Sequence, residues 1–238
     1  MKKHYLFDVD GTLTPSRQKI DPIFKQFMMD FCTDNSVSLV SGSDYEKTVE
    51  QLGEDLADRV RYCFSCSGNW VRDTVTKQIT ERHVNLPVEL VSWLEQQLAN
   101  SAFHIRTGRH FENRTGTLNF SIVGRNCSLE QRASYVEWDN RYQERMRIAT
   151  GLNQLFPHLE ATVGGETGID ITVRGCNKSQ VLSWFDKDTK LIFFGDATHL
   201  GGNDYPLADV IVSKRRGVVY TVRSWTETYE TLQHLSEV

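Results

Sequence analysis

The sequence lacks a hydrophobic run long enough to cross a membrane. Its longest apolar stretches, such as Leu191–Phe194, fall far short of the roughly 20 residues that a transmembrane helix needs. The basic start at residues 1–4 is followed by only a short apolar stretch before Asp8, so the apolar segment of a secretory signal is missing too. We therefore expect a cytoplasmic protein with no membrane partner.

The sequence also lacks an excess of basic charge and a framework of paired cysteines. Its 27 Lys and Arg residues stand against 31 Asp and Glu residues, whereas general nucleic-acid binders usually carry a basic excess. We expect no nucleic-acid partner and favour small-molecule chemistry. The five cysteines are odd in number and scattered, which argues against a disulfide framework. Cys63 and Cys66 have the C-x-x-C spacing but no second pair, so they are interpreted as ordinary thiols.

What the sequence does contain begins with alternating strands and helices. A short apolar run ends at Asp8, and a turn follows it. Asp21 and Pro22 predict the start of an amphipathic helix, Val37–Val40 predicts a second buried strand, and a further helix runs to Leu52. This alternation is typical of a parallel α/β sheet.

The middle of the chain has a different pattern. The expected elements there are a hairpin over 71–84, a helix over 87–100, a strand over 117–123, one long helix over 128–155, and strands over 161–163 and 169–173. After Gly175 the first pattern resumes. The expected elements are a helix over 178–185, strands over 191–194, 210–212 and 218–222, and a last helix from Ser224.

The economical interpretation is an α/β core built from both ends of the chain. We predict a parallel-sheet core over residues 1–78 and 177–238, with an α+β cap domain inserted over 79–176. Ligands of open α/β sheets bind beyond the carboxyl ends of the strands. Asp8, Ser41 and Asp196 all follow predicted strands, so we expect these side chains to share one site.

The segment from Asp8 to Thr12 carries the clearest chemistry. It places two carboxylates, Asp8 and Asp10, two residues apart between a buried strand and a turn. One carboxylate can attack phosphorus and form an aspartyl phosphate, while the other moves the proton on an alcohol oxygen. Such close carboxylates need a counterion, and their oxygens suit Mg²⁺.

These residues resemble the haloacid-dehalogenase-like (HAD) superfamily, whose first motif is D-x-D-G-T, and more closely its eukaryotic-type phosphomannomutases. The matching segments cover nearly the whole chain: Leu6–Thr14, Arg17–Ile20, Gly42–Lys47, Glu50–Gly53, Gly124–Ser128 with Glu130 and Arg132, Gly164-Gly165 with Asp170, and Phe193–Asp196 with Gly201–Asp204. The resemblance implies a Rossmann-like HAD core with an inserted cap.

The resemblance also implies roles for residues of the core. Asp8 would be the phosphorylated nucleophile, Asp10 the acid/base, and Lys178 the cation that neutralises phosphoryl charge. Mg²⁺ would be held by the Asp8 carboxylate, the Asp10 backbone carbonyl and Asp196. The phosphoryl group would be bound by Ser41 or Ser43, between which the sequence does not decide. Asn203 and Asp204 are expected just outside the metal's direct ligands, with a plain polar turn as the alternative.

Arginine is concentrated in the predicted cap. Five arginines lie between residues 104 and 132 in a chain that is acidic as a whole. Their planar guanidinium groups suit bidentate binding of phosphate, although a solvated basic face would have the same composition. The resemblance assigns substrate phosphate to Arg17, Arg114, Arg125 and Arg132, and a sugar hydroxyl to Asp170. Arg106 and Arg109 have no match and are expected at the surface.

Three departures from the family pattern concern substrate binding more than core chemistry. Gly168 replaces a serine, Cys176 and Asn177 replace a Trp-Asp pair, and Ala197 replaces a lysine. These changes put mannose selectivity and mutase efficiency in question.

The function that these features predict is isomerisation of mannose 6-phosphate and mannose 1-phosphate, which would supply GDP-mannose synthesis. The enzyme would work through phospho-Asp8, with Mg²⁺ as cofactor and hexose 1,6-bisphosphate as activator. The alternative is a Mg²⁺-dependent sugar-phosphate phosphatase, in which water attacks phospho-Asp8. A non-catalytic sugar-phosphate-binding protein is disfavoured because the full set of core residues is present. The resemblance also allows a homodimer through the cap.

Overall fold

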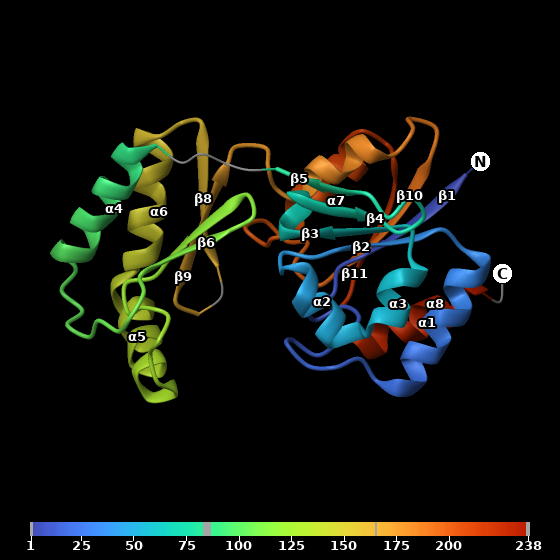
Figure 1. Cartoon of the computed structure of the whole chain (residues 1–238), viewed down its shortest axis with the longest axis horizontal. Helices are drawn as coiled ribbons and strands as arrows, with labels where there is room; N and C mark the ends of the chain where they lie inside the picture. The colour runs from blue at the N-terminus through green and yellow to red at the C-terminus, as the bar shows by residue number, and fades with distance from the viewer. Residues whose placement is uncertain (1, 83–86, 165, 237–238) are drawn as a thin grey trace. The chain divides into compact units, whose positions relative to one another are not determined.

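The computed structural model describes residues 2–82, 87–164 and 166–236 (Figure 1). The chain divides into two compact units. We call Met1–Arg82 together with Cys176–Val238 the core unit, and His83–Gly175 the inserted unit. Among the described helices, none combines the length and hydropathy that a bilayer crossing requires.

The core unit contains a seven-stranded sheet in the order β11-β10-β1-β2-β3-β4-β5. Its strands are β1 (Lys3–Phe7), β2 (Val37–Val40), β3 (Tyr62–Ser65), β4 (Trp70–Asp73), β5 (Ile79–Glu81), β10 (Lys190–Gly195) and β11 (Gly217–Thr221). The pairs from β11 to β3 are parallel, and β4 and β5 add an antiparallel edge. This sheet confirms the predicted α/β class. Residues 79–81, which the sequence analysis placed in the inserted segment, pair here with β4.

Helices cover both faces of this sheet (Figure 1). The core unit's helices are α1 (Pro22–Asp34), α2 (Tyr45–Leu52), α3 (Glu54–Arg59), α7 (Tyr205–Ser213), α8 (Trp225–Ser236) and the 3₁₀ helices η1 (Cys66–Gly68) and η2 (Lys178–Trp184). On one face, Phe24 of α1 and Leu232 of α8 pack around Phe7. On the other face, Val181 of η2 and Leu207 of α7 pack in a second apolar cluster.

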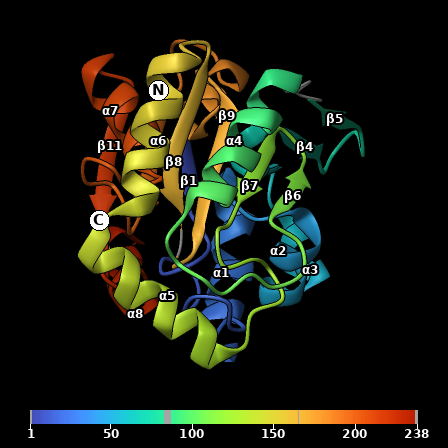
Figure 2. The ribbon, with the colours of Figure 1, turned by 90° about the vertical axis from the view of Figure 1, so that its left-hand side faces the viewer.

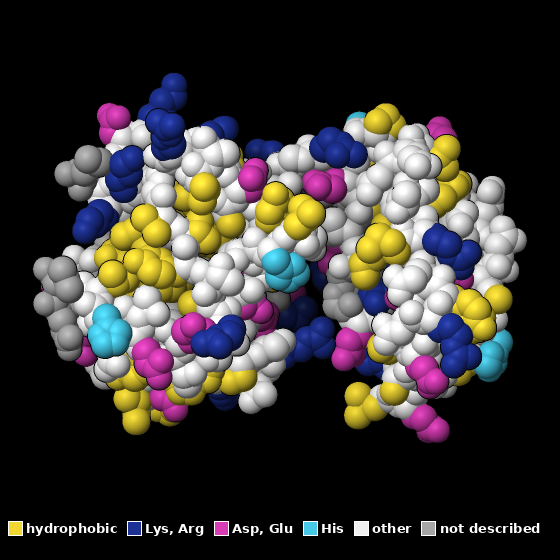
Figure 3. All heavy atoms as spheres, turned by 180° about the vertical axis from the view of Figure 1, so that it is seen from behind, with side chains coloured by type: hydrophobic (Ala, Val, Ile, Leu, Met, Phe, Trp, Pro, Cys, Tyr) yellow, Lys and Arg dark blue, Asp and Glu magenta, His cyan; other side chains and the backbone are white. Residues whose placement is uncertain are grey.

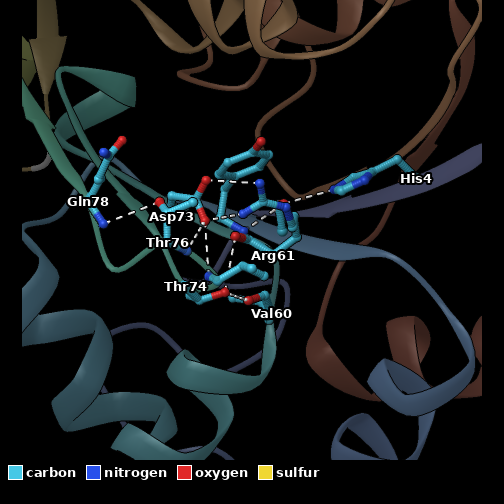
Figure 4. Close-up of polar contacts among 10 residues, drawn as sticks. His4, Val60, Arg61, Asp73, Thr74, Thr76 and Gln78 are labelled. Carbon is cyan, nitrogen blue, oxygen red and sulfur yellow. Dashed lines mark hydrogen bonds and ion pairs between the residues drawn. The ribbon is translucent and has the colours of Figure 1, made fainter.

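An ion pair closes the β3–β4 hairpin (Figure 4). Arg61 donates to both carboxylate oxygens of Asp73, the Nη2 to Oδ2 distance being 2.9 Å. Oδ1 of Asp73 also accepts from the backbone N–H groups of Val75 and Thr76, each at 3.0 Å. The hydrogen bond from Arg61 is the main reason that the pKa of Asp73 lies well below its usual range. The antiparallel edge of the sheet is therefore stabilised by this ion pair as well as by the backbone hydrogen bonds between its strands.

The inserted unit is a four-stranded antiparallel sheet with helices on one face (Figure 2). Its elements are β6 (Phe111–Arg114), β7 (Thr117–Phe120), β8 (Leu159–Gly164), β9 (Gly168–Val173), α4 (Val88–Asn100), α5 (Leu129–Tyr142) and α6 (Glu144–Leu155). Leu94 of α4 and Leu152 of α6 pack on Phe120 and Ile171 of the sheet. The predicted capping box is confirmed, because Ser128 and Gln131 exchange side-chain-to-backbone hydrogen bonds.

The expected single helix over 128–155 is wrong. The chain breaks at Gln143, which has a left-handed φ of 51° between α5 and α6. Asp139 stabilises the break, since it accepts 2.8 Å bonds from both the backbone N–H and the Nε of Arg145. The buried Asp139 carboxylate thus accepts a hydrogen bond from a backbone N–H group that has no partner within the first turn of α6. No local sequence pattern predicts this contact.

The expected strand over 210–212 is also wrong. These residues belong to α7, where Leu207 and Ile211 are fully buried on one face. Pro206 lies in the first turn of the helix, where its missing N–H costs no hydrogen bond. Packing of this face on the sheet therefore overrides the strand preference of three β-branched residues.

Charged and hydrophobic side chains are interspersed on the face shown in Figure 3. Both Lys or Arg and Asp or Glu side chains lie on each unit, and the formal net charge of the chain is −4. No disulfide joins the cysteines of the described residues, and the Cys63 thiol donates to the carbonyl of Ala57.

Candidate active site

The core unit's candidate site lies at the carboxyl edge of the parallel sheet. Asp8 directly follows β1, and its backbone N–H donates to the carbonyl of Phe194 on neighbouring β10 over 2.9 Å. Asp196 follows β10, and Ser41 follows β2 on the other side of β1. Parallel strands end at the same edge of a sheet, so these three polar residues are brought to one side of the core unit.

Lys178 joins two carboxylates in the interior. Its Nζ donates to Oδ1 of Asp8 at 2.5 Å and to Oδ1 of Asp204 at 2.6 Å, and the Lys178 side chain is fully buried. The other Asp204 oxygen accepts from the backbone N–H of Ala197 at 3.1 Å. Burial lowers the pKa of Lys178, but the carboxylates of Asp204 and Asp8 outweigh it and raise that pKa above its usual value. The ammonium group therefore stays charged.

Asp8, Asp196 and Asp204 form a carboxylate cluster. One oxygen from each lies within 4.8 Å of the others, the only such group of potential metal ligands in the described part of the chain. Burial raises the pKa of Asp8 to about 8 against the opposing effect of Lys178, and burial together with Asp204 raises the pKa of Asp196. Burial and mutual repulsion disfavour three ionised carboxylates beside one ammonium, and a divalent cation such as Mg²⁺, which prefers hard oxygen ligands, would stabilise their ionised forms.

Two glycines make room for this cluster. A Cβ atom on Gly11, whose φ is +82°, would collide with the carboxylate of Asp196. A Cβ on Gly195 would lie 2.7 Å from Oδ2 of Asp204. Both carboxylates therefore approach the backbone at points that only glycine leaves open.

Asp10 is held by hydrogen bonds to its carboxylate. Its Oδ1 accepts from the backbone N–H of Arg17 at 2.6 Å and from Nε2 of Gln51 at 3.0 Å. Gln51 is buried on α2 and also donates to Oγ1 of Thr14 at 3.0 Å. Gln51 is not among the site residues predicted from the sequence, although an amide on the buried face of an amphipathic helix is a signal of such a role.

The loop after β2 carries the two serines between which the sequence did not decide. Ser41 is buried, and its Oγ accepts from the backbone N–H of Ser43 at 3.0 Å. The Ser41 hydroxyl therefore keeps its own proton for donation to a ligand. Asn203, expected just outside the metal's direct ligands, lies beside this loop: a Cβ on Gly42 would be 3.8 Å from its Nδ2.

The inserted unit brings together three of its four candidate residues. Oε2 of Glu112 accepts a hydrogen bond from Nη2 of Arg114 at 2.6 Å and forms an ion pair with Nη2 of Arg125 at 2.9 Å. Asp170 lies 4.0 Å from Nη1 of Arg114. Glu112 therefore gathers two guanidinium groups that the sequence could not place next to each other.

Asn119 extends this group of polar side chains across the face of the inserted sheet that its helices do not cover. Asn119 lies directly opposite Glu112 on one side and Asp170 on the other, and its Nδ2 donates to Oδ1 of Asp170 at 2.6 Å. A Cβ on Gly168 would lie 2.6 Å from the same Nδ2. The Asn119 amide thus occupies the space that a serine side chain at position 168 would enter.

The other arginines lie in different surroundings. Arg132 forms an ion pair with Glu166, and Arg17 is exposed. Arg106, expected at the surface, donates to backbone carbonyls at the end of α4, among them Leu98 and Ser101 at 3.0 and 3.1 Å. It therefore caps a helix, which is a structural role.

The fold is that of the haloacid-dehalogenase-like enzymes. A solved structure of a haloacid dehalogenase-like hydrolase from Bacteroides thetaiotaomicron matches it with a TM-score of 0.64 and 13% sequence identity, over 99% of this chain and 100% of that chain.

Sequence comparison narrows this class to one family. The family model for eukaryotic phosphomannomutase matches residues 24–238. A phosphomannomutase from Oryza sativa subsp. indica is 33% identical over 237 residues, covering 97% of this chain and 94% of the relative. One from Arabidopsis thaliana is 34% identical over 210 residues, covering 85% of each. The chain belongs to the eukaryotic phosphomannomutase family, which confirms the resemblance seen in the sequence.

Proposed function

We propose that the protein interconverts mannose 6-phosphate and mannose 1-phosphate through a phosphorylated Asp8, and so supplies mannose 1-phosphate for GDP-mannose synthesis. The observation that carries the proposal is the contact of Asp8 with the buried Lys178, at the sheet edge where α/β enzymes bind their ligands. Membership of the phosphomannomutase family supports the choice of sugar phosphate.

The proposed reaction begins with a hexose 1,6-bisphosphate as activator. An Asp8 oxygen attacks one phosphorus atom, the bond from that phosphorus to the sugar oxygen breaks, and Asp10 donates a proton to the departing oxygen. In the reverse sense Asp10 takes the proton from a hydroxyl of the incoming hexose phosphate, whose oxygen attacks phospho-Asp8. Gln51 and the backbone of Arg17 keep the Asp10 carboxylate in place for both steps.

Charge at the site supports this chemistry. Lys178 is fully buried and charged, and it would offset part of the phosphoryl charge next to Asp8. Asp8, the backbone carbonyl of Asp10, and Asp196 would hold Mg²⁺, which when bound supplies positive charge against the phosphoryl oxygens. Asp204 would act from outside the metal's ligands, since both of its oxygens already accept hydrogen bonds from Lys178 and Ala197. Ser41 and Ser43 would donate to the transferred phosphoryl group.

The inserted unit, His83–Gly175, would serve as the cap that the sequence predicts over 79–176. Arg114 and Arg125 would bind the phosphate that does not react, with Arg17 and Arg132 as further cations, and Asp170 would bind a sugar hydroxyl. The pairing of Arg114 and Arg125 through Glu112 supports this proposal, because it holds two guanidinium groups near one point. Asn119, which fills the space beside Gly168, would stand where the family's serine hydroxyl is missing.

The test is an assay with mannose 1-phosphate, Mg²⁺ and a trace of hexose 1,6-bisphosphate. Mannose 6-phosphate and free phosphate are measured in the same samples. The proposal expects mannose 6-phosphate to form faster than free phosphate, and expects Asp8→Asn to abolish its formation while the folded state persists in thermal unfolding. Release of free phosphate alone by the wild type would instead identify a phosphatase.

A further inference from the structure

The loop that follows β3 adopts a backbone conformation that side chains rarely allow. Cys66 has φ of 50°, Ser67 has φ of 59° with ψ of 27°, and Gly68 has φ of 88°. Residues other than glycine seldom occupy this left-handed region, because Cβ approaches the following carbonyl oxygen. Such conformations persist where surrounding contacts impose them, and they are concentrated at functional sites.

Hydrogen bonds from two directions impose the conformation. The backbone N–H of Cys66 donates to the carbonyl of Ser43, and that of Ser67 donates to the carbonyl of Ser41, both at 2.8 Å. From the other side, Nε2 of Gln180 on η2 donates to the carbonyl of Ser67, also at 2.8 Å. The loop is therefore tied both to the serine loop after β2 and to the helix that carries Lys178.

This geometry places the Ser67 hydroxyl beside Gly42. A Cβ atom built on Gly42 would lie 3.9 Å from Oγ of Ser67 and 3.8 Å from Nδ2 of Asn203. Ser67 is half-buried, whereas Gly42 is exposed and presents no side chain between these two polar groups. A hydroxyl and an amide, both able to donate, thus flank an accessible point on the loop between Ser41 and Ser43.

We propose that Ser67 is a further substrate-binding residue, whose Oγ donates a hydrogen bond to a phosphate oxygen lying over Gly42 while Asn203 donates from the other side. The ligand class is a phosphomonoester. A glycine at position 67 would adopt the observed backbone without steric cost, so a residue serving only as a turn has no need of the hydroxyl. This inference rests on the proposed function for the identity of the substrate, though not for the binding of phosphate itself.

Three variants distinguish the effect of the Ser67 hydroxyl from that of the left-handed backbone conformation. Ser67→Gly removes both the hydroxyl and the steric cost, whereas Ser67→Ala removes the hydroxyl alone. Lys77→Gly is the matched control, because Lys77 is an exposed residue of the β4–β5 turn with the same left-handed φ of 58°. Thermal unfolding, kcat and KM for the hexose phosphate, and the Kd of inorganic phosphate from calorimetry are measured for each.

We expect both Ser67 variants to lose at least about 10-fold in kcat/KM and to bind inorganic phosphate about 10-fold more weakly, in line with one lost hydrogen bond to a charged group. Ser67→Gly should do so while melting at or above the wild-type temperature, and Lys77→Gly should keep wild-type binding and kinetics. A Ser67→Gly variant with wild-type phosphate affinity would overturn the inference. If Ser67→Gly does not fold, Ser67→Ala decides the question by the same affinity.

Calorimetry also keeps the two proposals distinguishable. Binding of inorganic phosphate needs no turnover, so the role of Ser67 is tested even if the wild type shows no mutase activity. In that event weaker phosphate binding by Ser67→Ala would support the phosphate contact, and the absent mannose 6-phosphate would count against the proposed function alone.

Discussion

Gln51 donates a hydrogen bond from Nε2 to Oδ1 of Asp10 over 3.0 Å, although the two residues lie 41 positions apart in the chain. The amide comes from a buried position on α2, and the carboxylate lies in the loop after β1. The same Nε2 donates to Thr14 at 3.0 Å, which fixes the amide relative to the loop. The orientation of the Asp10 carboxylate, the proposed acid/base, therefore depends on a helix that is remote in sequence.

Replacing Gln51 with Leu should slow phosphoryl transfer to sugar hydroxyls by about 10-fold, because Asp10 would lose one of the two donors that orient its carboxylate. Hydrolysis of an aryl phosphate should fall less, since a phenolate departs without a proton from Asp10. The ratio of the two kcat values measures the effect. Gln26→Ala, at an exposed position on α1, is the control. Equal losses in both reactions of Gln51→Leu would show that Gln51 stabilises the fold and does not orient Asp10.

Replacing Lys178 with Met should destabilise the folded protein by about 3–5 kcal/mol, the usual cost of removing one partner from a buried ion pair. The variant would leave the carboxylates of Asp8 and Asp204 buried without the ammonium that both now contact. Urea unfolding monitored by circular dichroism gives the free energy of unfolding. Lys47→Met, at an exposed position on α2, serves as the comparison, and an equally small change in both variants would contradict the prediction.

Replacing Arg125 with Ala should reduce hexose-phosphate isomerisation by at least about 10-fold, because a charge-assisted hydrogen bond is worth about 1.5–3 kcal/mol. The proposed contact orients the sugar hydroxyl toward phospho-Asp8, whereas a water molecule needs no such orientation. Hydrolysis of a small aryl phosphate should therefore change much less. Arg109→Ala on the exposed surface provides the control, and a parallel fall in both reactions of Arg125→Ala would assign that residue to the fold.

His4 should make the free energy of unfolding depend on pH. Burial, with smaller contributions from Lys2 and Arg61, lowers the pKa of His4 to about 4 from an ordinary value of 6.5. The unfolded chain therefore binds the proton of His4 more tightly than the folded protein does. The contribution of neutral His4 to the free energy of unfolding is fully present above about pH 6.5. It is lost as the pH falls toward 4, by up to about 3 kcal/mol.

His4→Gln tests this dependence because glutamine does not titrate. The imidazole nitrogens lie 2.8 Å from Oγ of Ser38 and 2.9 Å from Oγ of Ser36, and an amide can replace one of these contacts. Unfolding free energies at pH 7 and pH 5 should differ less for the variant than for the wild type. An unchanged difference would assign the pH dependence to other groups.

The sequence by itself determined the α/β class and the position of Asp8 at the end of the first strand. It could do so because apolar runs, helix caps and the spacing of Asp8 and Asp10 are properties of neighbouring residues. Asp21 and Asp44 cap the first two helices as their local sequence indicates. The family assignment likewise followed from contiguous motifs, and the family model confirmed it.

Only the tertiary structure decided which side chains meet. Lys178 contacts Asp8 across 170 positions in sequence, and Gln51 reaches Asp10 through the packing of α2 on the core. The break at Gln143 depends on a buried carboxylate, and the helix over 205–213 depends on the apolar face it buries. The hydrophobic period and the residue types limit the conformations of each segment separately. Burial and charge pairing between distant segments then select one of the conformations that each segment allows.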